Sequence, residues 1–385
     1  MKATLLPLVL VVLTVFGQAN SQTQLTVTAV NKLSVARHGE TIELNLQQLA
    51  SLTEKDLGKL HVHDSSGKEV LSQSVDTDYD DFRKPDQLIF QADFAPNETK
   101  TFVVTAGAKR VYEKKDFRAY GRFVRERFDD FAWENDRVGH RTYGKALITW
   151  KGEPLTSSAI DIWSKRTEKM VINDWYMVDN YHVDLGEGAD VYSAGPTRGV
   201  GGSGIWANSQ LFIPTNFVNS RVLTNGPIRV MFELMYEPFD VNGVMVSQVL
   251  RVSLDAGSQL NHFQPLYITP RGTEQLAVAI GLKKIKDAQK HLNAERGWLA
   301  VWEPMAQNLG MQGLGIVVNQ NDFDSVTEDR LNHLLLLKPR HVFPVSYWAG
   351  FAWDRAGKIT SADAWQKYLD QFAERRRSPI EVTVK

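Results

Sequence analysis

The chain has 385 residues, and its 44 Lys and Arg almost balance its 45 Asp and Glu, which leaves a net charge of −1 at pH 7. Without a basic block, this balance argues against a nucleic-acid partner. Cysteine is absent, which excludes disulfides, thiolate metal sites, a cysteine nucleophile and a lipid-modified N-terminal cysteine.

The N-terminus has the pattern of an export signal. Lys2 precedes an apolar run over residues 5–16, and Ala19-Asn20-Ser21 offers small residues at a cleavage site. The run is shorter than the ~20 apolar residues that cross a bilayer, and no second long run follows in the sequence. We therefore expect residues 1–21 to be a signal peptide, and the mature protein to be periplasmic or secreted with no membrane-bound part.

Residues 22–105 are predicted to form a small N-terminal β-sandwich unit. Apolar and polar residues alternate with period two in four short segments, which are 25–30, 41–46, 60–63 and 101–104. Turn-forming residues separate these segments, for example Asp64-Ser65-Ser66-Gly67.

Residues 106–385 are predicted to form a larger antiparallel β-sandwich. Strand-like segments occur at 145–150, 229–236, 245–254, 276–280, 297–302 and 314–318. Asn242-Gly243 between two apolar runs is typical of a tight hairpin turn. So many long strands favour a mainly β fold over one in which strands and helices alternate.

One helix is predicted near the C-terminus. Ser361 can cap its first turn, and Trp365, Tyr368, Leu369 and Phe372 follow the i, i+3, i+4, i+7 spacing of one helix face. The expected fold is therefore a large β-sandwich with a small N-terminal β unit and a C-terminal helix that packs on the sandwich.

Charged and aromatic residues concentrate between Trp133 and Trp206. If the segment around Arg137 is extended, Arg137, Arg141 and Tyr143 share one face. Two guanidiniums on one face can clamp a carboxylate or sulfate, and a nearby arginine is expected to lower the pKa of Tyr143 so that it acts as a base. The alternative is that the arginines form structural ion pairs with the neighbouring acids, namely Glu134, Asp136 and Asp161.

A second face follows in the same stretch. Asp161, Trp163 and Lys165 should point the same way, and a carboxylate, an aromatic ring and an ammonium together suit a sugar subsite. The alternative is an amphipathic strand with a solvated side.

The segment around His182 offers a candidate acid or base. His182 shares a face with Asp184, which could orient the imidazole, and Tyr181 beside it is a candidate substrate ligand. A divalent cation is an alternative, given the nearby acids, but their spacing fits no calcium loop, so we assign no metal ligand and expect no cofactor.

Glycines at 199, 201 and 204 match a G-x-G-x-x-G pattern in form only. No apolar strand precedes them and no helical pattern follows, so nucleotide binding is not expected. The glycines would instead let the backbone approach a ligand, with Arg198 and Trp206 at the rims. His262 is a further candidate acid or base. No G-x-S-x-G, H-E-x-x-H or phosphate-loop motif occurs in the sequence.

Six motifs together resemble a secreted bacterial family catalogued as a domain of unknown function and associated with polysaccharide-degradation gene clusters. They are ENDR (134–137), RTYG (141–144), AIDIW (159–163), NYHVD (180–184), GEGADVY (186–192) and SYWAG (346–350). The resemblance extends over nearly the whole mature chain. It implies a galactose-mutarotase-like β-supersandwich, as in several polysaccharide lyases, and lyase or dehydratase action on uronic-acid oligosaccharides. The family pattern has an apolar residue where this chain has His140.

The leading hypothesis is a carbon–oxygen lyase that performs β-elimination on an acidic oligosaccharide or polysaccharide. Arg141, with Arg137 or Arg198, would neutralise the uronate carboxylate. Tyr143 and His182 would serve as base and acid, with His262 as a substitute.

Two alternatives stay open. One is glycoside hydrolysis by two carboxylates, Asp161 with Glu134 or Asp184. The other is a non-catalytic sugar-binding protein that uses Trp163 and Trp206 as stacking platforms.

Overall fold

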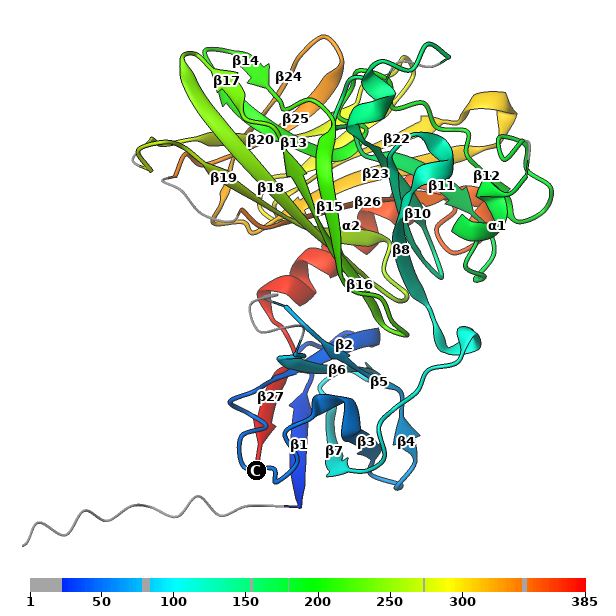
Figure 1. Ribbon diagram of the computed structural model, residues 1–385, viewed down its shortest axis with the longest axis vertical. Coiled ribbons are helices and arrows are strands. Elements are labelled where there is room, and N and C mark those ends of the chain that lie inside the picture. The colour runs from blue at the N-terminus through cyan, green and yellow to red at the C-terminus, as the bar shows by residue number, and fades with distance from the viewer. Residues whose placement is uncertain (1–22, 78–83, 153–154, 179, 273, 341–344) are drawn as a thin grey trace, which may run out of the picture.

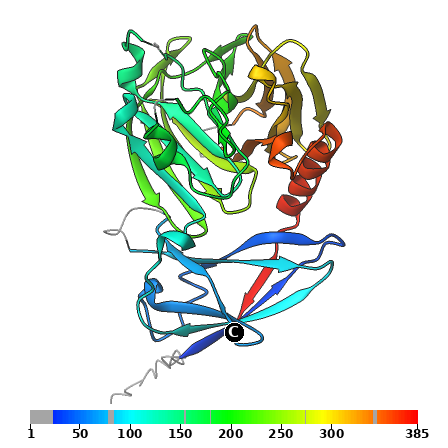
Figure 2. The same ribbon diagram turned by 90° about the vertical axis from the view of Figure 1, so that its right-hand side faces the viewer.

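The computed structural model describes residues 23–77, 84–152, 155–178, 180–272, 274–340 and 345–385. The predicted signal peptide, residues 1–21, lies outside the described residues. The prediction of a mainly β fold with a C-terminal helix is confirmed, since antiparallel strands dominate the described chain. Figures 1 and 2 show a smaller lobe and a larger lobe, with both described ends of the chain in the smaller one.

The smaller lobe contains two antiparallel sheets. In order across the first sheet are β27 (Glu381–Val384), β1 (Gln24–Val30), β7 (Thr99–Ala106), β3 (Leu60–Asp64) and β4 (Glu69–Val70). The second sheet has β2 (Arg37–Asn45), β6 (Gln87–Phe94) and β5 (Ser72–Val75). Their alternating apolar residues enclose a separate core that includes Val27, Leu44, Phe90 and Val104. The C-terminal strand β27 pairs with β1. The smaller lobe therefore contains the last residues of the chain in addition to residues from the 22–105 segment.

The larger lobe is built around three antiparallel sheets. The longest runs β15 (Phe217–Thr224), β16 (Arg229–Tyr236), β18 (Val244–Asp255), β19 (Leu260–Ile268), β26 (Tyr347–Trp353), β23 (Met311–Val318), β22 (Trp298–Pro304) and β21 (Gln289–Asn293), with β17 (Phe239–Val241) on β18. The second runs β14 (Gln210–Phe212), β13 (Val200–Ala207), β20 (Ala277–Lys283), β25 (Asn332–Leu337) and β24 (Phe323–Glu328). The third runs β12 (Gly188–Ala189), β11 (Asp161–Lys165), β10 (Gly139–Tyr143), β9 (Asp130–Asn135) and β8 (Ala119–Val124).

The strand predicted at 145–150 is wrong. Residues Lys145–Ile148 form a 3-10 turn instead, and only Leu147 within that turn is buried. The amide of Ala146 donates to the Asp129 carboxylate at 3.1 Å, which holds the chain in a turn beside the end of β10. Local hydrogen bonding therefore overrides the apolar pattern here.

The third sheet packs its β9 side chains into the core of the larger lobe. Phe131 and Trp133 lie 4.2 and 5.0 Å, between ring centroids, from Phe232 of the longest sheet. A chain of hydrogen bonds adds polar links: Trp133 Nε1 donates to Asn261 Oδ1 at 2.7 Å, and Asn261 Nδ2 donates to His140 Nε2 at 2.9 Å. Burial lowers the pKa of His140 to about 3, so this histidine is a neutral member of the core.

The side chain of His140 also links β10 to the next strand, β11. His140 Nδ1 donates to the carbonyl oxygen of Asp161 at 3.1 Å, which ties β10 to β11 through a side chain as well as through the strand ladder. A histidine whose two nitrogens are both used in this way is positioned within the protein, not toward a substrate.

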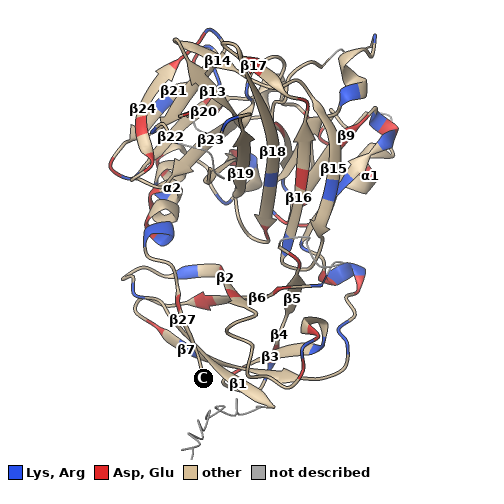
Figure 3. Ribbon diagram, turned by 60° about the vertical axis from the view of Figure 1, so that its left-hand side comes forward, with Lys and Arg blue, Asp and Glu red and all other residues tan. Residues whose placement is uncertain are grey.

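Charged residues join the two lobes. Arg229 of β16 donates to Asp255 at 2.6 and 2.8 Å and to Glu43 of β2 at 2.7 Å, while the Thr41 hydroxyl donates to Asp255 at 2.8 Å. Figure 3 shows charged residues on β2, on β16 and at the end of α2 (Ala362–Arg377), where the lobes face each other. These contacts hold the lobes in one arrangement.

The C-terminal helix α2 forms as predicted. The Ser361 hydroxyl accepts from the amide of Ala364 at 3.2 Å, and Trp365, Leu369 and Ala373 are buried. The helix packs on β22 and β23 and then leads into β27 of the smaller lobe, as Figure 2 shows. Among the described residues, no helix combines the length and apolar character that a membrane crossing needs.

The packing of α2 gives a first prediction. Replacing Leu369, which is fully buried, with Ala should lower the free energy of unfolding by about 2–5 kcal/mol, because the helix loses apolar contacts and leaves a cavity. Lys367→Ala, on the exposed face of the same helix, should change it by less than about 0.5 kcal/mol. Urea unfolding of both variants checks this, and equal losses would contradict the described packing of the helix.

Candidate functional site

Arg141 lies at the centre of a buried cluster of carboxylates. The register of β10 places it opposite Asp161 of β11, and its Nη2 lies 2.7 Å from Asp161 Oδ2. The same Nη2 lies 3.0 Å from Asp190 Oδ2, and Nη1 lies 3.7 Å from Asp130 Oδ2. All four residues are at most 3% exposed. We call Arg141, Asp130, Asp161 and Asp190 the Arg141 cluster.

Three tyrosines surround this cluster. Tyr143 donates to Asp161 Oδ2 at 2.6 Å, and Tyr176, from α1 (Ile172–Tyr176), donates to Asp130 Oδ2 at 3.1 Å. Tyr181 accepts from Arg141 Nη1 at 3.4 Å. The Arg141 guanidinium also lies 5.8 Å from the centroid of the Trp163 ring, which is itself fully buried. Trp163 therefore supports the cluster and is not an open stacking platform.

Burial sets the protonation of the carboxyl groups. It raises the pKa of Asp130 to about 7, although Arg141 opposes the shift. It also raises the pKa of Asp190, where the charge of Asp161 adds to the effect of burial. Burial therefore favours the protonated forms of Asp130 and Asp190. Asp161 accepts hydrogen bonds from Arg141 and Tyr143. The cluster therefore contains carboxyl groups that can donate protons beside one that accepts hydrogen bonds.

The expectation of a lowered pKa at Tyr143 is wrong. Burial and the charge of Asp161 raise the pKa of this phenol well above its ordinary value, and they outweigh the opposing effect of Arg141. Because its hydroxyl donates to Asp161, Tyr143 is protonated and orients that carboxylate. Its geometry suits a positioning residue, not a base.

His182 lies at the exposed edge of the cluster. Its Nδ1 lies 2.7 Å from the carbonyl oxygen of Asp190, and its side chain is 49% exposed. A carbonyl oxygen can only accept, so Nδ1 carries a proton, and in the neutral imidazole the lone pair is then on Nε2. Its ring centroid lies 4.5 Å from that of Tyr181, which is partly exposed. The exposed edge thus presents an imidazole and a phenol side by side.

Five other predicted site residues lie elsewhere or are fully engaged by the protein, and Lys165 and Arg137 are two of them. Lys165 is buried, with Nζ 2.5 Å from Glu134 Oε2 and 2.7 Å from the carbonyl oxygen of Asn135. Arg137 pairs with Glu168 at 2.9 Å on the surface. Arg137 therefore forms a structural ion pair, although with Glu168 and not with Glu134, Asp136 or Asp161. Lys165 is buried, so the solvated strand face given as the alternative for it is wrong.

Arg198 and Trp206 also have structural surroundings. Arg198 is 2% exposed, and its Nη2 donates to the carbonyl oxygen of Ser158 at 2.7 Å. Trp206 packs against a small apolar cluster beside Leu211. Among the described residues, neither Arg198 nor Trp206 forms a hydrogen bond or ion pair with the Arg141 cluster.

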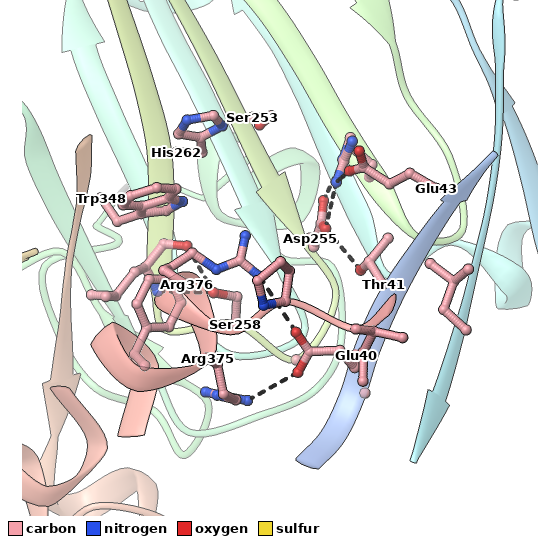
Figure 4. Close-up of a pocket in the computed structure, with 18 of the residues that line it drawn as sticks. Glu40, Thr41, Glu43, Ser253, Asp255, Ser258, His262, Trp348, Arg375 and Arg376 are labelled. Atoms are coloured by element: carbon pink, nitrogen blue, oxygen red, sulfur yellow. Dashed lines mark hydrogen bonds and ion pairs between the residues drawn. The ribbon is translucent and has the colours of Figure 1, made fainter. Parts of the chain in front are cut away.

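His262 lies in a separate groove between the lobes, shown in Figure 4. The groove has a volume of about 780 Å³, and its described lining includes His262, Trp348, Arg376 and Glu40 but no member of the Arg141 cluster. His262 Nε2 lies 2.7 Å from the Ser346 hydroxyl, and its ring stacks on Trp348 at 4.9 Å. Burial and two arginines lower its pKa to about 4. The structure therefore does not bring His262 to His182.

The structure adds three residues to the predicted site. Asp130 is paired with Tyr143 in the strand register, Asp190 follows the glycine-rich loop, and Tyr176 lies on the short helix α1. In the sequence, Asp190 is one of the acids near His182, with Asp184 and Glu187, that suggest a cation, and nothing in the local sequence marks Asp130 or Tyr176. Among the described residues, no group of three or more His, Asp and Glu is arranged to hold a metal ion.

Comparison with known proteins places the chain in a family. Residues 30–382 match the model described as Domain of unknown function (DUF4861). The chain belongs to this family. It is 33% identical over 373 residues to Uncharacterized protein P7 of Formosa agariphila, an alignment that covers 93% of each protein.

Solved structures of similar fold come from Enterococcus faecalis. One is a protein in the glycosyl hydrolase family 38, with a TM-score of 0.52 and 11% identity, and another is an alpha-mannosidase, with a TM-score of 0.51 and 10% identity. Both alignments cover 95% of this chain, which spans only 48% and 46% of those longer proteins. At this level of identity the likeness concerns the fold.

The raised pKa of Asp130 gives a second prediction. The unfolded chain releases this proton near pH 3.8 and the folded protein near pH 7, so Asp130 makes the free energy of unfolding fall as pH rises through that window. Asp130→Asn cannot ionise and should make this fall shallower. Urea unfolding over about pH 4 to pH 8 measures it, with Asp324→Asn on the exposed strand β24 as control. An unchanged pH slope in Asp130→Asn would show that Asp130 does not titrate there.

Proposed function

We propose that this protein is an exported carbohydrate-active enzyme that cleaves uronic-acid oligosaccharides by β-elimination at the exposed edge of the Arg141 cluster. The observation that carries the proposal is the orientation of His182. Its Nδ1 is fixed on the Asp190 carbonyl at 2.7 Å, so the lone pair of Nε2 is available on a half-exposed ring. A base held in this way beside a phenol and a buried arginine suits proton abstraction next to a carboxylate.

The charge of the cluster favours an acidic substrate. Arg141 supplies a positive charge behind the exposed edge, with its Nη1 3.4 Å from the Tyr181 hydroxyl. Burial favours the neutral forms of Asp130 and Asp190, which weakens the negative charge that faces Arg141. A substrate carboxylate at the exposed edge is attracted by the Arg141 charge, which lowers the cost of removing the neighbouring proton.

The reaction then follows from two side chains. His182 Nε2 takes the C5 proton of the uronate, the electron pair of that C–H bond forms the C4=C5 double bond, and the bond from C4 to its oxygen breaks. Tyr181 supplies the proton that the departing oxygen needs. Burial raises the pKa of Tyr181, so its phenol stays protonated until that step. A departing glycosidic oxygen makes the enzyme a lyase, and a departing hydroxyl makes it a dehydratase.

Glycoside hydrolysis is the second candidate, and the carboxyl groups favour it. Burial raises the pKa of Asp130 to about 7, while Asp161 accepts hydrogen bonds from Arg141 and Tyr143. Both carboxyls lie on one guanidinium, and two carboxyls in different environments are what hydrolases use. The solved structures of similar fold are a glycosyl hydrolase family 38 protein and an alpha-mannosidase, which adds to this alternative. Hydrolysis differs from elimination in its product, which has a new reducing end and no double bond.

A third prediction tests the elimination. Purified protein is incubated with uronic-acid polysaccharides and with their oligosaccharides, and the ultraviolet absorbance of the conjugated C4=C5 double bond is followed. His182→Gln and Tyr181→Phe should each lower kcat/KM by about 100- to 10,000-fold, because a proton-transfer group is lost. His63→Gln and Tyr112→Phe, both in the smaller lobe, are the matched controls and should retain activity.

The products separate the alternatives. A rise in absorbance on polymers indicates a lyase, and a rise only on oligosaccharides with a saturated terminal uronate indicates a dehydratase. New reducing ends without absorbance would replace elimination by hydrolysis. Saturable binding without any product would replace both by a binding protein.

A further inference from the structure

The groove between the lobes is lined by polar side chains from one face of the longest sheet. Its volume of about 780 Å³ lies within the ~300–1,000 Å³ range of small-molecule sites. In the strand register, Arg251 of β18 is paired with Gln264 of β19, Ser253 with His262, and His262 with Trp348 of β26. Paired residues on neighbouring strands point to the same side, so these five form one surface, part of which Figure 4 shows. We call them the groove face.

Four side chains of the groove face have polar atoms that are open to the groove. Among the described residues, no hydrogen-bond partner occurs for Arg251 Nη1, Ser253 Oγ, His262 Nδ1 or the side-chain amide of Gln264. None of these atoms is among the buried side-chain atoms that lack a partner, so each has accessible surface. A ligand in the groove can therefore bond to them without breaking a hydrogen bond within the protein.

The protein holds two of these groups in fixed positions. Arg251 Nε and Nη2 donate to Glu233 Oε1 at 2.9 and 2.6 Å, which fixes the guanidinium and leaves Nη1 over. His262 Nε2 lies 2.7 Å from the Ser346 hydroxyl, and the imidazole stacks on Trp348 with ring centroids 4.9 Å apart. Groups that are fixed before binding lose little freedom when a ligand arrives.

The charge at one end of the groove face favours an anion. Glu233 accepts from Arg251 and also from Arg221 Nε, at 2.6 Å. One carboxylate cannot neutralise two guanidiniums, so a positive charge is left at the place where Arg251 Nη1 is free to donate.

The other end of the groove has a similar excess. The carboxylate oxygens of Glu40 lie 3.4–3.7 Å from guanidinium nitrogens of three arginines, which are Arg37, Arg375 and Arg376. Arg229 between the two ends is paired with two carboxylates, which removes part of the excess. The arginines of the groove and of its ion pairs still outnumber the carboxylates, so the groove attracts an anionic ligand.

We propose that the groove is a second carbohydrate site, which binds an acidic saccharide at the groove face, apart from the Arg141 cluster. The anionic group of the ligand, a carboxylate or a sulfate ester, accepts from Arg251 Nη1, and neighbouring hydroxyl groups bond to Ser253, His262 and Gln264. The site does not depend on the proposed elimination, because no member of the Arg141 cluster lines the groove.

Hydroxyl groups beside an anion match the groove face better than other ligands. Arg251 only donates, whereas Ser253 and Gln264 donate and accept. His262 Nδ1 donates or accepts according to which partner of its bond with Ser346 carries the proton. A bare sulfate offers only acceptors and leaves the Gln264 carbonyl oxygen without a donor. An apolar ligand would bury all these groups without partners, and the arginines oppose a metal cation.

Calorimetry tests the site. In the mature protein carrying His182→Gln to stop turnover, isothermal titration calorimetry measures the affinity for trigalacturonate, for a sulfated oligogalactan without uronate and for neutral maltotriose. One acidic probe should bind more tightly than maltotriose, and its identity shows whether the anion is a carboxylate or a sulfate. Adding Arg251→Gln should weaken its binding by about 10- to 100-fold, because a hydrogen bond between charged groups is lost. Arg110→Gln, which removes an arginine paired with Glu69 in the smaller lobe, is the matched control.

A second variant separates binding from folding. The Gln264 amide has no partner among the described residues, so Gln264→Met should leave the melting temperature unchanged or raise it. It should nevertheless lower the affinity for the acidic probe by about 2- to 10-fold, because hydrogen bonds to the ligand are lost. Gln289→Met, on the exposed strand β21 at the far edge of the same sheet, should change neither quantity.

The groove site and the elimination fail in different ways. Unchanged affinity in either groove variant, equal affinity for maltotriose and the acidic probes, or no saturable binding of any probe would overturn the groove site. If no uronate gives an unsaturated product but both groove variants lose affinity, elimination is overturned and the groove site stands. If the wild-type enzyme forms the product while either groove variant keeps its affinity, the groove site is overturned and elimination stands.

Discussion

A positive charge held inside the protein organises the region in which we place the chemistry. Arg141 is 3% exposed, so its guanidinium has lost nearly all its water and depends on protein groups for compensation. Those groups come from three places along the chain: Asp130 on β9, Asp161 on β11 and Asp190 after β12. Removing any of them leaves a buried charge less compensated, which is why this part of the sheet has one arrangement.

The exposed edge of the Arg141 cluster, where His182 and Tyr181 lie, depends on that arrangement. The peptide of Asp190 holds His182 through its carbonyl oxygen and, through its amide, donates to the carbonyl oxygen of Tyr181 at 3.0 Å. The side chain of the same residue pairs with Arg141 at 3.0 Å. Asp190 thus connects a buried charge to two partly exposed groups that can move protons.

Much of this could be predicted from period-two patterns. The mainly β fold, the capped C-terminal helix and the shared face of Arg141 and Tyr143 follow from local sequence. The strand register that brings Asp161 to that face does not. The local sequence does not show how completely each of these strands is buried. Every residue of β9, β10 and β11 is buried, because the longest sheet covers one side and α1 with the loop around Tyr181 covers the other.

That burial reverses the expected chemistry of several residues. It raises the pKa of Tyr143 where a neighbouring arginine alone would lower it, and it makes Lys165 the partner of Glu134 rather than of a ligand. Long-range pairing is equally invisible in a local pattern. Contacts between residues far apart in the sequence pair β27 with β1. Such contacts also place His182 at an exposed edge and His262 in the groove between the lobes.

Buried polar groups are paired in one part of the lobe interface and left without hydrogen bonds in another. Arg229 is paired with Asp255 and Glu43, and the Thr41 hydroxyl adds to the same carboxylate. Glu40 Oε2 and Arg375 Nε belong to residues that line the groove between the lobes, and neither atom has a hydrogen-bond partner among the described residues. The same is true of Asp130 Oδ1 in the Arg141 cluster. Because buried polar atoms without hydrogen bonds cost stability, the groove and the Arg141 cluster both give up part of what the paired Arg229 contributes.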